Sequence, residues 1–190
     1  MKQGKEERVF LDGSNLFIEG QRLSSFLRRG ATAVTVTQHT EFDFDFRLDL
    51  RRLKSFLGGD LGTSRPLLVG SHSENSDALF ASAHHCGFDT IVYERDTRNR
   101  EKKVDTTIVM HMLLAALDGT PEKTRLILVA GDSDYAPLVL ELRRRKFEVE
   151  VVFWGHASHE LKEAATRFVP LDGVIDFLRY HPTYPATSVA

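Results

Sequence analysis

The chain has 190 residues, of which 42% are hydrophobic and 27% are charged, and its formal net charge is −2. These values are typical of a soluble globular protein with one substantial core, and they exclude a strong overall basic field of the kind that attracts nucleic acid. The single cysteine, Cys86, excludes an internal disulfide framework and a cysteine zinc site, and no apolar stretch is long enough to cross a membrane. We therefore expect a cytoplasmic protein that does not associate with membranes.

Short apolar runs alternate with helical patterns along the whole chain. Strands are expected at 8–11, 66–70, 88–93, 126–130, 149–154 and 168–171, and helices at 15–28, 71–86, 103–117, 135–146, 159–167 and 173–179. This alternation predicts an α/β fold with a mostly parallel central sheet and right-handed crossovers. The helix at 103–117 is apolar on most faces, which predicts that it is well buried.

Three further features concern local structure. Ser71 and Glu74 have the spacing of a capping box for the helix that follows, and Gly87 is expected to end that helix. The segment 30–46 interrupts the alternation, and an extra hairpin, a flap over the site and a dimer contact are all open interpretations. The residues 180–190 contain two prolines and are expected to form a loose tail.

Four aspartates follow predicted strands or begin a predicted helix. Asp12 follows the first strand, Asp132 and Asp134 follow the strand at 126–130, and Asp105 opens the helix at 103–117. Because the carboxyl ends of parallel strands line one edge of a sheet, these carboxylates are expected to form an oxygen-rich site for a hard divalent cation. Each also has a local alternative, since aspartate is common in turns and at helix N-termini.

Polar and basic groups accompany these acids. Ser14 and Asn15 follow Asp12, and either of them could cap the first helix or contact a bound phosphate or water. A basic run precedes Asp105 and is a candidate for phosphate contacts, with a solvated loop as the alternative. Its members are Arg95, Arg98, Arg100, Lys102 and Lys103.

Aromatic and histidine side chains near the acidic segments have less specific interpretations. Phe17 and Tyr135 are candidates for base stacking, although core packing is the favoured interpretation for Phe17. His156 and His159 follow the strand at 149–154 and are candidates for substrate contact. The basic run 143–146 ends a helix, where cations favour the helix dipole, so no substrate role is assigned to it.

Three other families with an aspartate after the first strand fit less well. An adhesion domain of the von Willebrand factor A type needs a ligand at the position of Leu16, and a haloacid-dehalogenase phosphatase needs an acid at the position of Ser14. A dinucleotide-binding domain needs a glycine-rich loop, whereas 12–17 contains only Gly13.

Four segments, taken in order, resemble the NYN domain family, a branch of the PIN-like nuclease superfamily. They are Asp12-Gly-Ser-Asn15, Lys103-Val-Asp105-Thr-Thr-Ile108, Gly131-Asp-Ser-Asp134-Tyr-Ala-Pro-Leu138 and Gly155-His-Ala-Ser158-His-Glu-Leu161, the last continuing to Phe168-Val-Pro-Leu171. The resemblance extends over most of 9–171 and implies one Rossmann-like, PIN-like domain at 7–179, with helices on both faces of the sheet and 30–46 as an insertion.

The resemblance also implies a function, namely metal-dependent hydrolysis of phosphodiester bonds in nucleic acid, mainly single-stranded RNA, with Mg²⁺ or Mn²⁺ as cofactor. The alternative is a non-catalytic NYN-like module that binds RNA or protein, and homo-oligomerisation stays open. The family's metal-binding and catalytic acids fall on Asp12, Asp105, Asp132 and Asp134, with Asn15 as its characteristic amide. The substrate-binding candidates are Ser14, Ser133, Arg100, Lys102 and Lys103.

Overall fold

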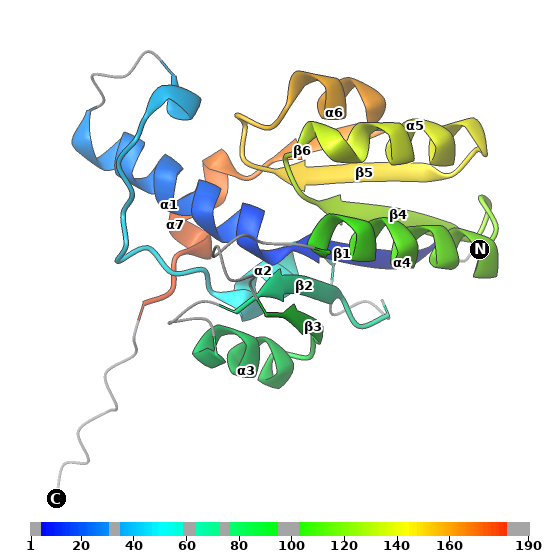
Figure 1. The fold of residues 1–190 in the computed structure, drawn as a ribbon, viewed down its shortest axis with the longest axis horizontal. Coiled ribbons are helices and arrows are strands. Elements are labelled where there is room, and N and C mark those ends of the chain that lie inside the picture. The colour runs from blue at the N-terminus through cyan, green and yellow to red at the C-terminus, as the bar shows by residue number, and fades with distance from the viewer. Residues whose placement is uncertain (1–4, 31–34, 59–63, 73–76, 95–102, 182–190) are drawn as a thin grey trace, which may run out of the picture.

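The computed structural model describes residues 5–30, 35–58, 64–72, 77–94 and 103–181. Six parallel strands form one sheet in the order β3-β2-β1-β4-β5-β6 (Figure 1). The strands are β1 (Glu6–Asp12), β2 (Leu67–Ser71), β3 (Asp89–Tyr93), β4 (Thr124–Val129), β5 (Glu148–Phe153) and β6 (Arg167–Pro170). The α/β fold with a parallel sheet is therefore confirmed.

Helices connect the strands and cover both faces of the sheet. They are α1 (Gly13–Arg29), α2 (Leu50–Phe56), α3 (Asp77–His85), α4 (Val104–Asp118), α5 (Ala136–Arg144), α6 (His159–Ala164) and α7 (Ile175–Leu178). Three 3₁₀ turns accompany them, namely η1 (Val36–Gln38), η2 (Ser133–Tyr135) and η3 (Asp172–Val174). Among the helices that the structure describes, none has the length and apolar character needed to cross a bilayer.

The strand order changes direction between β1 and β4. From β1 the chain proceeds outward to β2 and β3, and it then crosses back to β4, which pairs with the other side of β1 from Glu6↔Thr124 to Leu11↔Val129. The carboxyl ends of β1 and β4 therefore lie side by side at the point where the connections diverge. Parallel α/β sheets bind their ligands at such a switch point, because the loops that follow the two strands leave a crevice there.

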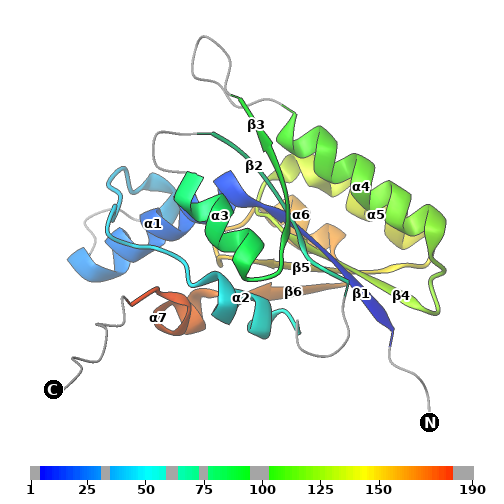
Figure 2. The same ribbon diagram turned by 90° about the horizontal axis from the view of Figure 1, so that it is seen from below.

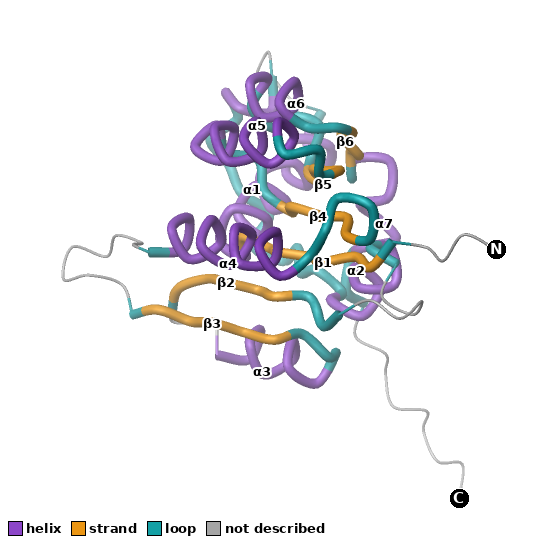
Figure 3. The backbone as a smooth tube through the Cα atoms, turned by 90° about the vertical axis from the view of Figure 1, so that its right-hand side faces the viewer, coloured by secondary structure: helices purple, strands orange, loops and turns teal. Residues whose placement is uncertain are grey.

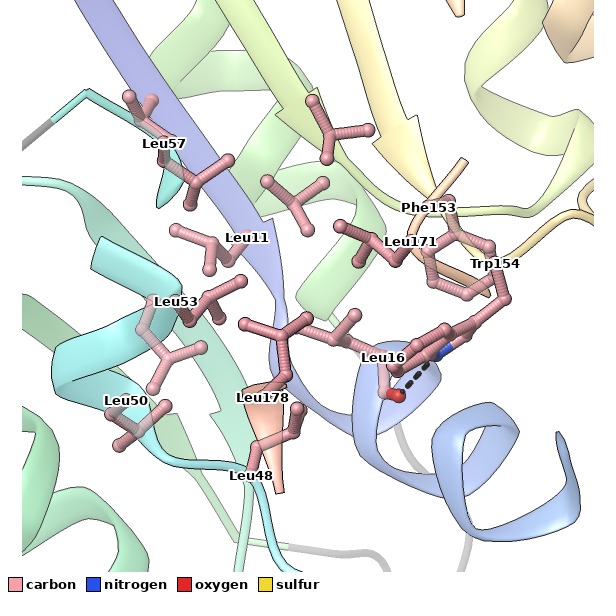
Figure 4. Close-up of a cluster of buried hydrophobic side chains, with 14 of the residues drawn as sticks. Leu11, Leu16, Leu48, Leu50, Leu53, Leu57, Phe153, Trp154, Leu171 and Leu178 are labelled. Carbon is pink, nitrogen blue, oxygen red and sulfur yellow. Dashed lines mark hydrogen bonds between the residues drawn. The ribbon is translucent and has the colours of Figure 1, made fainter. Parts of the chain in front are cut away.

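Helices α1, α2, α3 and α7 cover one face of the sheet, and α4, α5 and α6 cover the other (Figures 2 and 3). On the first face, Leu11 of β1 packs with Leu16 of α1 and Leu53 of α2, and all three are fully buried. The indole nitrogen of Trp154 donates a hydrogen bond of 2.9 Å to the Leu16 carbonyl, so this core fixes the start of α1 (Figure 4). The start of α1 is also where Asp12 lies.

The second face corrects the prediction that the helix at 103–117 is well buried. Ile108 and Met112 of α4 are buried against the sheet, but four apolar side chains on its outer side are exposed. They are Met110, Leu113, Leu114 and Leu117. The prediction was wrong because α4 lies on the outside of the molecule, so that only its inner side meets the sheet.

The capping-box prediction at Ser71 was also wrong, whereas the stop at Gly87 is confirmed. Ser71 is the last residue of β2 and pairs with Tyr93 of β3, so it belongs to the sheet. Glu74 lies outside the described residues, and the described part of α3 begins at Asp77. Gly87 ends the helix with φ +84°, a conformation that favours glycine, and its N–H donates to the His84 carbonyl.

The described part of the insertion, 35–46, contains the turn η1 and no strand, while 31–34, where part of one arm of the hairpin was expected, lie outside the described residues. The segment 35–46 packs along α1. Phe46 is buried against Trp154, and Asp43 accepts hydrogen bonds from Ser24 and Arg28. The insertion is therefore part of the core on this face.

At the end of the fold, Arg179 donates to Ser24 and Asp43, and the Tyr180 N–H donates to the Arg47 carbonyl. The predicted tail is thus attached at its first residue, and 182–190 lie outside the described residues. Helix α2, which the sequence analysis did not predict, lies near this point and is capped by Asp49, whose Oδ1 accepts from the Arg51 and Arg52 N–H groups.

Candidate active site

A cleft of about 270 Å³ lies at the carboxyl ends of β1 and β4, where the strand order changes direction. Three segments of the chain line it, and three of the four predicted aspartates are among the lining residues. The lining residues are Asp12, Ser14, Asn15, Ile18, Glu19, Lys103, Val104, Asp105 and Asp132. The structure therefore brings together side chains that are 120 positions apart in the sequence, from Asp12 to Asp132.

Asp12 is the most deeply placed of these acids, with 5% of the residue exposed. It ends β1 and caps α1, because its Oδ1 accepts a hydrogen bond of 3.0 Å from the Asn15 N–H. Its Oδ2 accepts a hydrogen bond of 3.0 Å from the Tyr135 hydroxyl. A buried carboxylate is costly unless it is hydrogen-bonded, and these contacts hold Asp12 in one orientation at the cleft.

Asp105 reaches the same hydroxyl from a different part of the fold. It lies in the first turn of α4 and is itself exposed, yet its Oδ1 accepts a hydrogen bond of 2.9 Å from Tyr135. An acid in the first turn of a helix also interacts favourably with the helix dipole. The Tyr135 hydroxyl therefore joins carboxylates from β1 and α4 at one point.

Tyr135 itself is fully buried among the apolar side chains beneath α4 and α5. Burial first, and then the negative charges of Asp12 and Asp105 and the hydrogen bonds to them, raise the pKa of Tyr135 above its ordinary value. The phenol therefore keeps its proton and acts as a hydrogen-bond donor. Base stacking by Tyr135, one interpretation of the sequence, is excluded because its ring has no exposed face.

Asp132 lines the cleft, whereas Asp134 and Ser133 are not among its lining residues. The Oδ1 atom of Asp132 accepts hydrogen bonds from the Asp134 N–H at 3.1 Å and from the Ser133 hydroxyl at 3.3 Å. Asp132 thus caps the turn η2. Asp134 is exposed and is the second residue of this turn, two positions after Asp132.

Asn15 connects the two strands that carry the site. Its side-chain oxygen accepts a hydrogen bond of 2.9 Å from the Gly131 N–H, just after β4. The Gly131 carbonyl in turn accepts from the Ser158 N–H at 2.8 Å. A side chain at Gly131 would not fit, because a Cβ atom there would lie 2.1 Å from the Phe153 ring. The amide that was predicted as a functional residue therefore aligns the ends of β1 and β4.

Lys103 is the basic residue of the run 95–103 that the structure describes, and it lines the cleft. Its backbone has φ +74°, an uncommon conformation for a residue with a side chain, and it caps α4 next to Asp105. Its ammonium lies 5.6 Å from the centre of the Tyr93 ring. Arg100 and Lys102, the other basic candidates for substrate binding, lie outside the described residues, as do Arg95 and Arg98.

Glu19 is a fourth acid of the cleft that the sequence analysis missed. It lies in α1 one turn beyond Asn15 and is bound by His156 at 2.7 Å and by Arg22 at 3.2 Å. The helical spacing of Asn15 and Glu19 was a signal that could have found it, since residues four apart share one side of a helix. The contact also gives His156 a role in the structure, because its Nε2 atom is hydrogen-bonded to the Glu19 carboxylate.

The other side chains considered from the sequence lie elsewhere. Phe17 packs against the core, which confirms the favoured interpretation, and His159 forms an exposed pair with Glu163. Arg143 donates to the Glu163 and Ala164 carbonyls, while Arg144 and Arg145 pair with Glu141, so the basic run ending α5 is occupied by local contacts.

The donor set of the cleft suits a hard divalent cation, because its acidic side chains offer oxygen alone. Across the described residues, no three histidine, cysteine or acidic side chains stand close enough together to hold a metal ion as a group. Mg²⁺, however, is often held by one or two protein carboxylates with water and substrate phosphate as its remaining ligands. Asp12 and Asp105, which meet at one hydroxyl, fulfil that requirement, and Asp132 lines the same cleft.

Comparisons with known proteins bear on the fold and the family of the chain. The chain resembles a crystal structure of a protein of unknown function from Vibrio parahaemolyticus, with a TM-score of 0.66 and 17% identity, covering 95% of this chain and 99% of that one. At this identity the likeness shows the fold alone. Comparison with curated proteins finds no significant match. The family model of the NYN domain matches residues 8–172. The chain therefore belongs to the NYN domain family, within the PIN-like nuclease superfamily.

Proposed function

We propose that this protein is a metal-dependent ribonuclease that hydrolyses phosphodiester bonds in single-stranded RNA. The observation that carries the proposal is the convergence of Asp12 and Asp105 on one hydroxyl, in the cleft that Asp132 also lines. Membership of a nuclease family supports the reaction class, and the position of the cleft at the switch point of the sheet supports its use as a binding site.

Asp12 and Asp105 are the proposed metal-binding residues, and Asp132 completes the acidic wall of the cleft. Mg²⁺ or Mn²⁺ bound there would supply the Lewis acidity and the charge neutralisation that phosphodiester hydrolysis requires. Both side-chain oxygens of Asp12 accept hydrogen bonds, so this carboxylate would be the ligand with the more firmly fixed orientation. Asp134, exposed two positions after Asp132, is proposed to act on the outer side of the site, where it would orient water.

Lys103, a basic side chain that lines the cleft, is proposed to contact the phosphates of the RNA backbone. Lys103 lies two residues before Asp105, so an RNA phosphate drawn to its ammonium would arrive next to Asp105. Ser14, which also lines the cleft, is proposed to hydrogen-bond the substrate. Contacts to phosphates are independent of base identity, so this arrangement gives no sequence preference.

The test is cleavage of a labelled single-stranded RNA with Mn²⁺, Mg²⁺ or EDTA. We expect metal-dependent cleavage by the wild type and a loss of at least about a hundredfold in Asp12→Asn and Asp132→Asn, because each removes a charge from the site. Asp118→Asn is the matched control, since Asp118 is exposed at the far end of α4 and should leave the activity unchanged. Equal cleavage by all four proteins would indicate a contaminating nuclease.

The alternative is a non-catalytic NYN-like module that binds RNA or protein. RNA binding by the wild type without metal-dependent cleavage would favour this alternative over a ribonuclease. A single-stranded DNA of the same sequence, used in parallel, tests the choice of RNA, and preferential cleavage of the DNA would contradict it.

A further inference from the structure

The Tyr135 hydroxyl has an unusual set of partners for a buried tyrosine. It lies 3.0 Å from Asp12 Oδ2 and 2.9 Å from Asp105 Oδ1, and both of these atoms belong to ionisable groups that line the cleft. The two carboxylate oxygens are therefore no more than about 6 Å apart, the sum of the two hydrogen-bond lengths. Two like charges at this separation repel each other, and the hydroxyl lies between them as a shared hydrogen-bond donor.

The two carboxylates differ in burial. Asp12 ends a central strand, is 5% exposed and is also bound by the Asn15 N–H. Asp105 is exposed in the first turn of α4. The bond from Tyr135 turns Asp105 inward, toward Asp12. The ring of Tyr135 is fully buried, so the hydroxyl that makes this bond has a fixed position.

One hydroxyl carries a single proton, so it donates fully to only one carboxylate at a time. The hydroxyl therefore sets the spacing of the pair without adding a positive charge between the two carboxylates. We propose that Tyr135 is a positioning residue, which presets the distance between Asp12 and Asp105 for a divalent cation. This inference rests on the proposed function for the identity of the ligand, but it concerns the affinity of the site rather than cleavage.

The test compares Tyr135→Phe with Tyr93→Phe. Both variants lose one hydroxyl and keep the ring, and the Tyr93 hydroxyl, 2.8 Å from Thr107 Oγ1, also ties α4 to the sheet without contacting an acid of the cleft. Mn²⁺ binding is measured by calorimetry and by the electron paramagnetic resonance signal of free Mn²⁺, without RNA. We expect the Kd of Tyr135→Phe to rise about 10- to 100-fold, as for other groups that orient metal ligands. Tyr93→Phe should keep the wild-type Kd.

RNA cleavage as a function of Mn²⁺ concentration gives a second readout. In Tyr135→Phe the half-maximal Mn²⁺ concentration should rise with the Kd, and saturating Mn²⁺ should restore most of the wild-type rate. A general loss of structure would instead lower the rate at every Mn²⁺ concentration. Thermal melts in EDTA show whether the variant is folded.

A measurement on the wild-type protein tests the role of Tyr135 without relying on the Tyr135→Phe variant. The Tyr135 hydroxyl proton should exchange slowly with solvent, and its NMR signal should shift when Mg²⁺ is added. An unshifted signal at saturating Mg²⁺, or one Kd shared by the wild type and Tyr135→Phe, would overturn the role of Tyr135 alone. Mn²⁺ binding without cleavage would overturn the ribonuclease alone, and the absence of Mn²⁺ binding by the wild type would overturn both.

Discussion

The side-chain oxygen of Asn15 accepts a hydrogen bond of 2.9 Å from the backbone N–H of Gly131. The contact joins the first turn of α1 to the second residue after β4, so it aligns the two chain segments that carry Asp12 and Asp132. Because this hydrogen bond fixes the Asn15 side chain, we assign Asn15 the role of aligning Asp12 and Asp132. A buried N–H without a partner is costly, which makes this single contact important for stability.

Replacing Asn15 by alanine should therefore lower the free energy of unfolding by about 1–3 kcal/mol, because the buried Gly131 N–H loses its acceptor. Urea unfolding measures the difference. The alignment role is wrong if Asn15→Ala is as stable as the wild type.

Divalent ions should stabilise the wild type against heat, because a ligand that binds only the folded state raises its stability. At an ion concentration of one hundred times Kd the gain is about 2.7 kcal/mol. Thermal melts with Mn²⁺, Mg²⁺ or EDTA should show the shift in the wild type and in Asp118→Asn. The shift should be absent in Asp12→Asn and Asp105→Asn, and its persistence in both would place the ion elsewhere.

Lys103→Gln should weaken RNA binding and reduce its dependence on salt. Each phosphate contact to single-stranded nucleic acid contributes about 0.7 to the slope of log K against log salt, so the slope should fall by about that amount. Lys146→Gln is the matched control, because Lys146 is also an exposed lysine with positive φ but lies at the end of α5. Binding titrations at several salt concentrations measure the slope, and an equal slope in the two variants would exclude a phosphate contact at Lys103.

Acid stability should depend on Asp43, which ties the insertion to α1 and α7. Burial disfavours the charge of Asp43, but hydrogen bonds from Ser24 and Arg28 and the charges of Arg28 and Arg179 outweigh burial and lower its pKa to about 2. A carboxyl whose pKa is lower in the folded state stabilises the fold above its unfolded pKa of about 3.8. That stabilisation is lost as the pH falls from about 4 to about 2.

Wild type and Asp43→Asn should thus differ in unfolding free energy by about 2 kcal/mol near neutral pH, and the difference should shrink as the pH falls below about 4. Guanidinium unfolding at several pH values measures this difference. Asp45→Asn, two residues away and exposed, is the control and should show no such convergence. A difference between the wild type and Asp43→Asn that is constant from pH 6 to pH 2 would contradict the assignment.

Much of the fold follows from local patterns in the sequence. The strands at 126–130 and 149–154 are short apolar runs between turn residues, and the sheet indeed contains β4 and β5 there. The position of the helix at 103–117 was predicted correctly, but the extent of its burial was predicted wrongly. An apolar sequence does not indicate which sides of a helix pack against a neighbouring element. The exposure of Leu117 depends on which elements pack around α4, and that is a property of the whole fold.

The candidate site, like the fold, was predictable only in part. Strand ends in a parallel sheet share one edge, so Asp12 and Asp132 could be expected together, and both line the cleft. The hydroxyl of Tyr135 could not be expected there, since the turn η2 buries its ring and aims its oxygen at residues 123 and 30 positions away. Side-chain contacts of this kind depend on the three-dimensional path of the chain.

The measurement that tests the account most directly is a crystal structure with Mn²⁺, located by its anomalous scattering. The account predicts a strong peak in the cleft, at coordination distance from carboxylate oxygens of both Asp12 and Asp105. A structure at saturating Mn²⁺ with no anomalous peak in the cleft, or with a peak bound to neither aspartate, would contradict it.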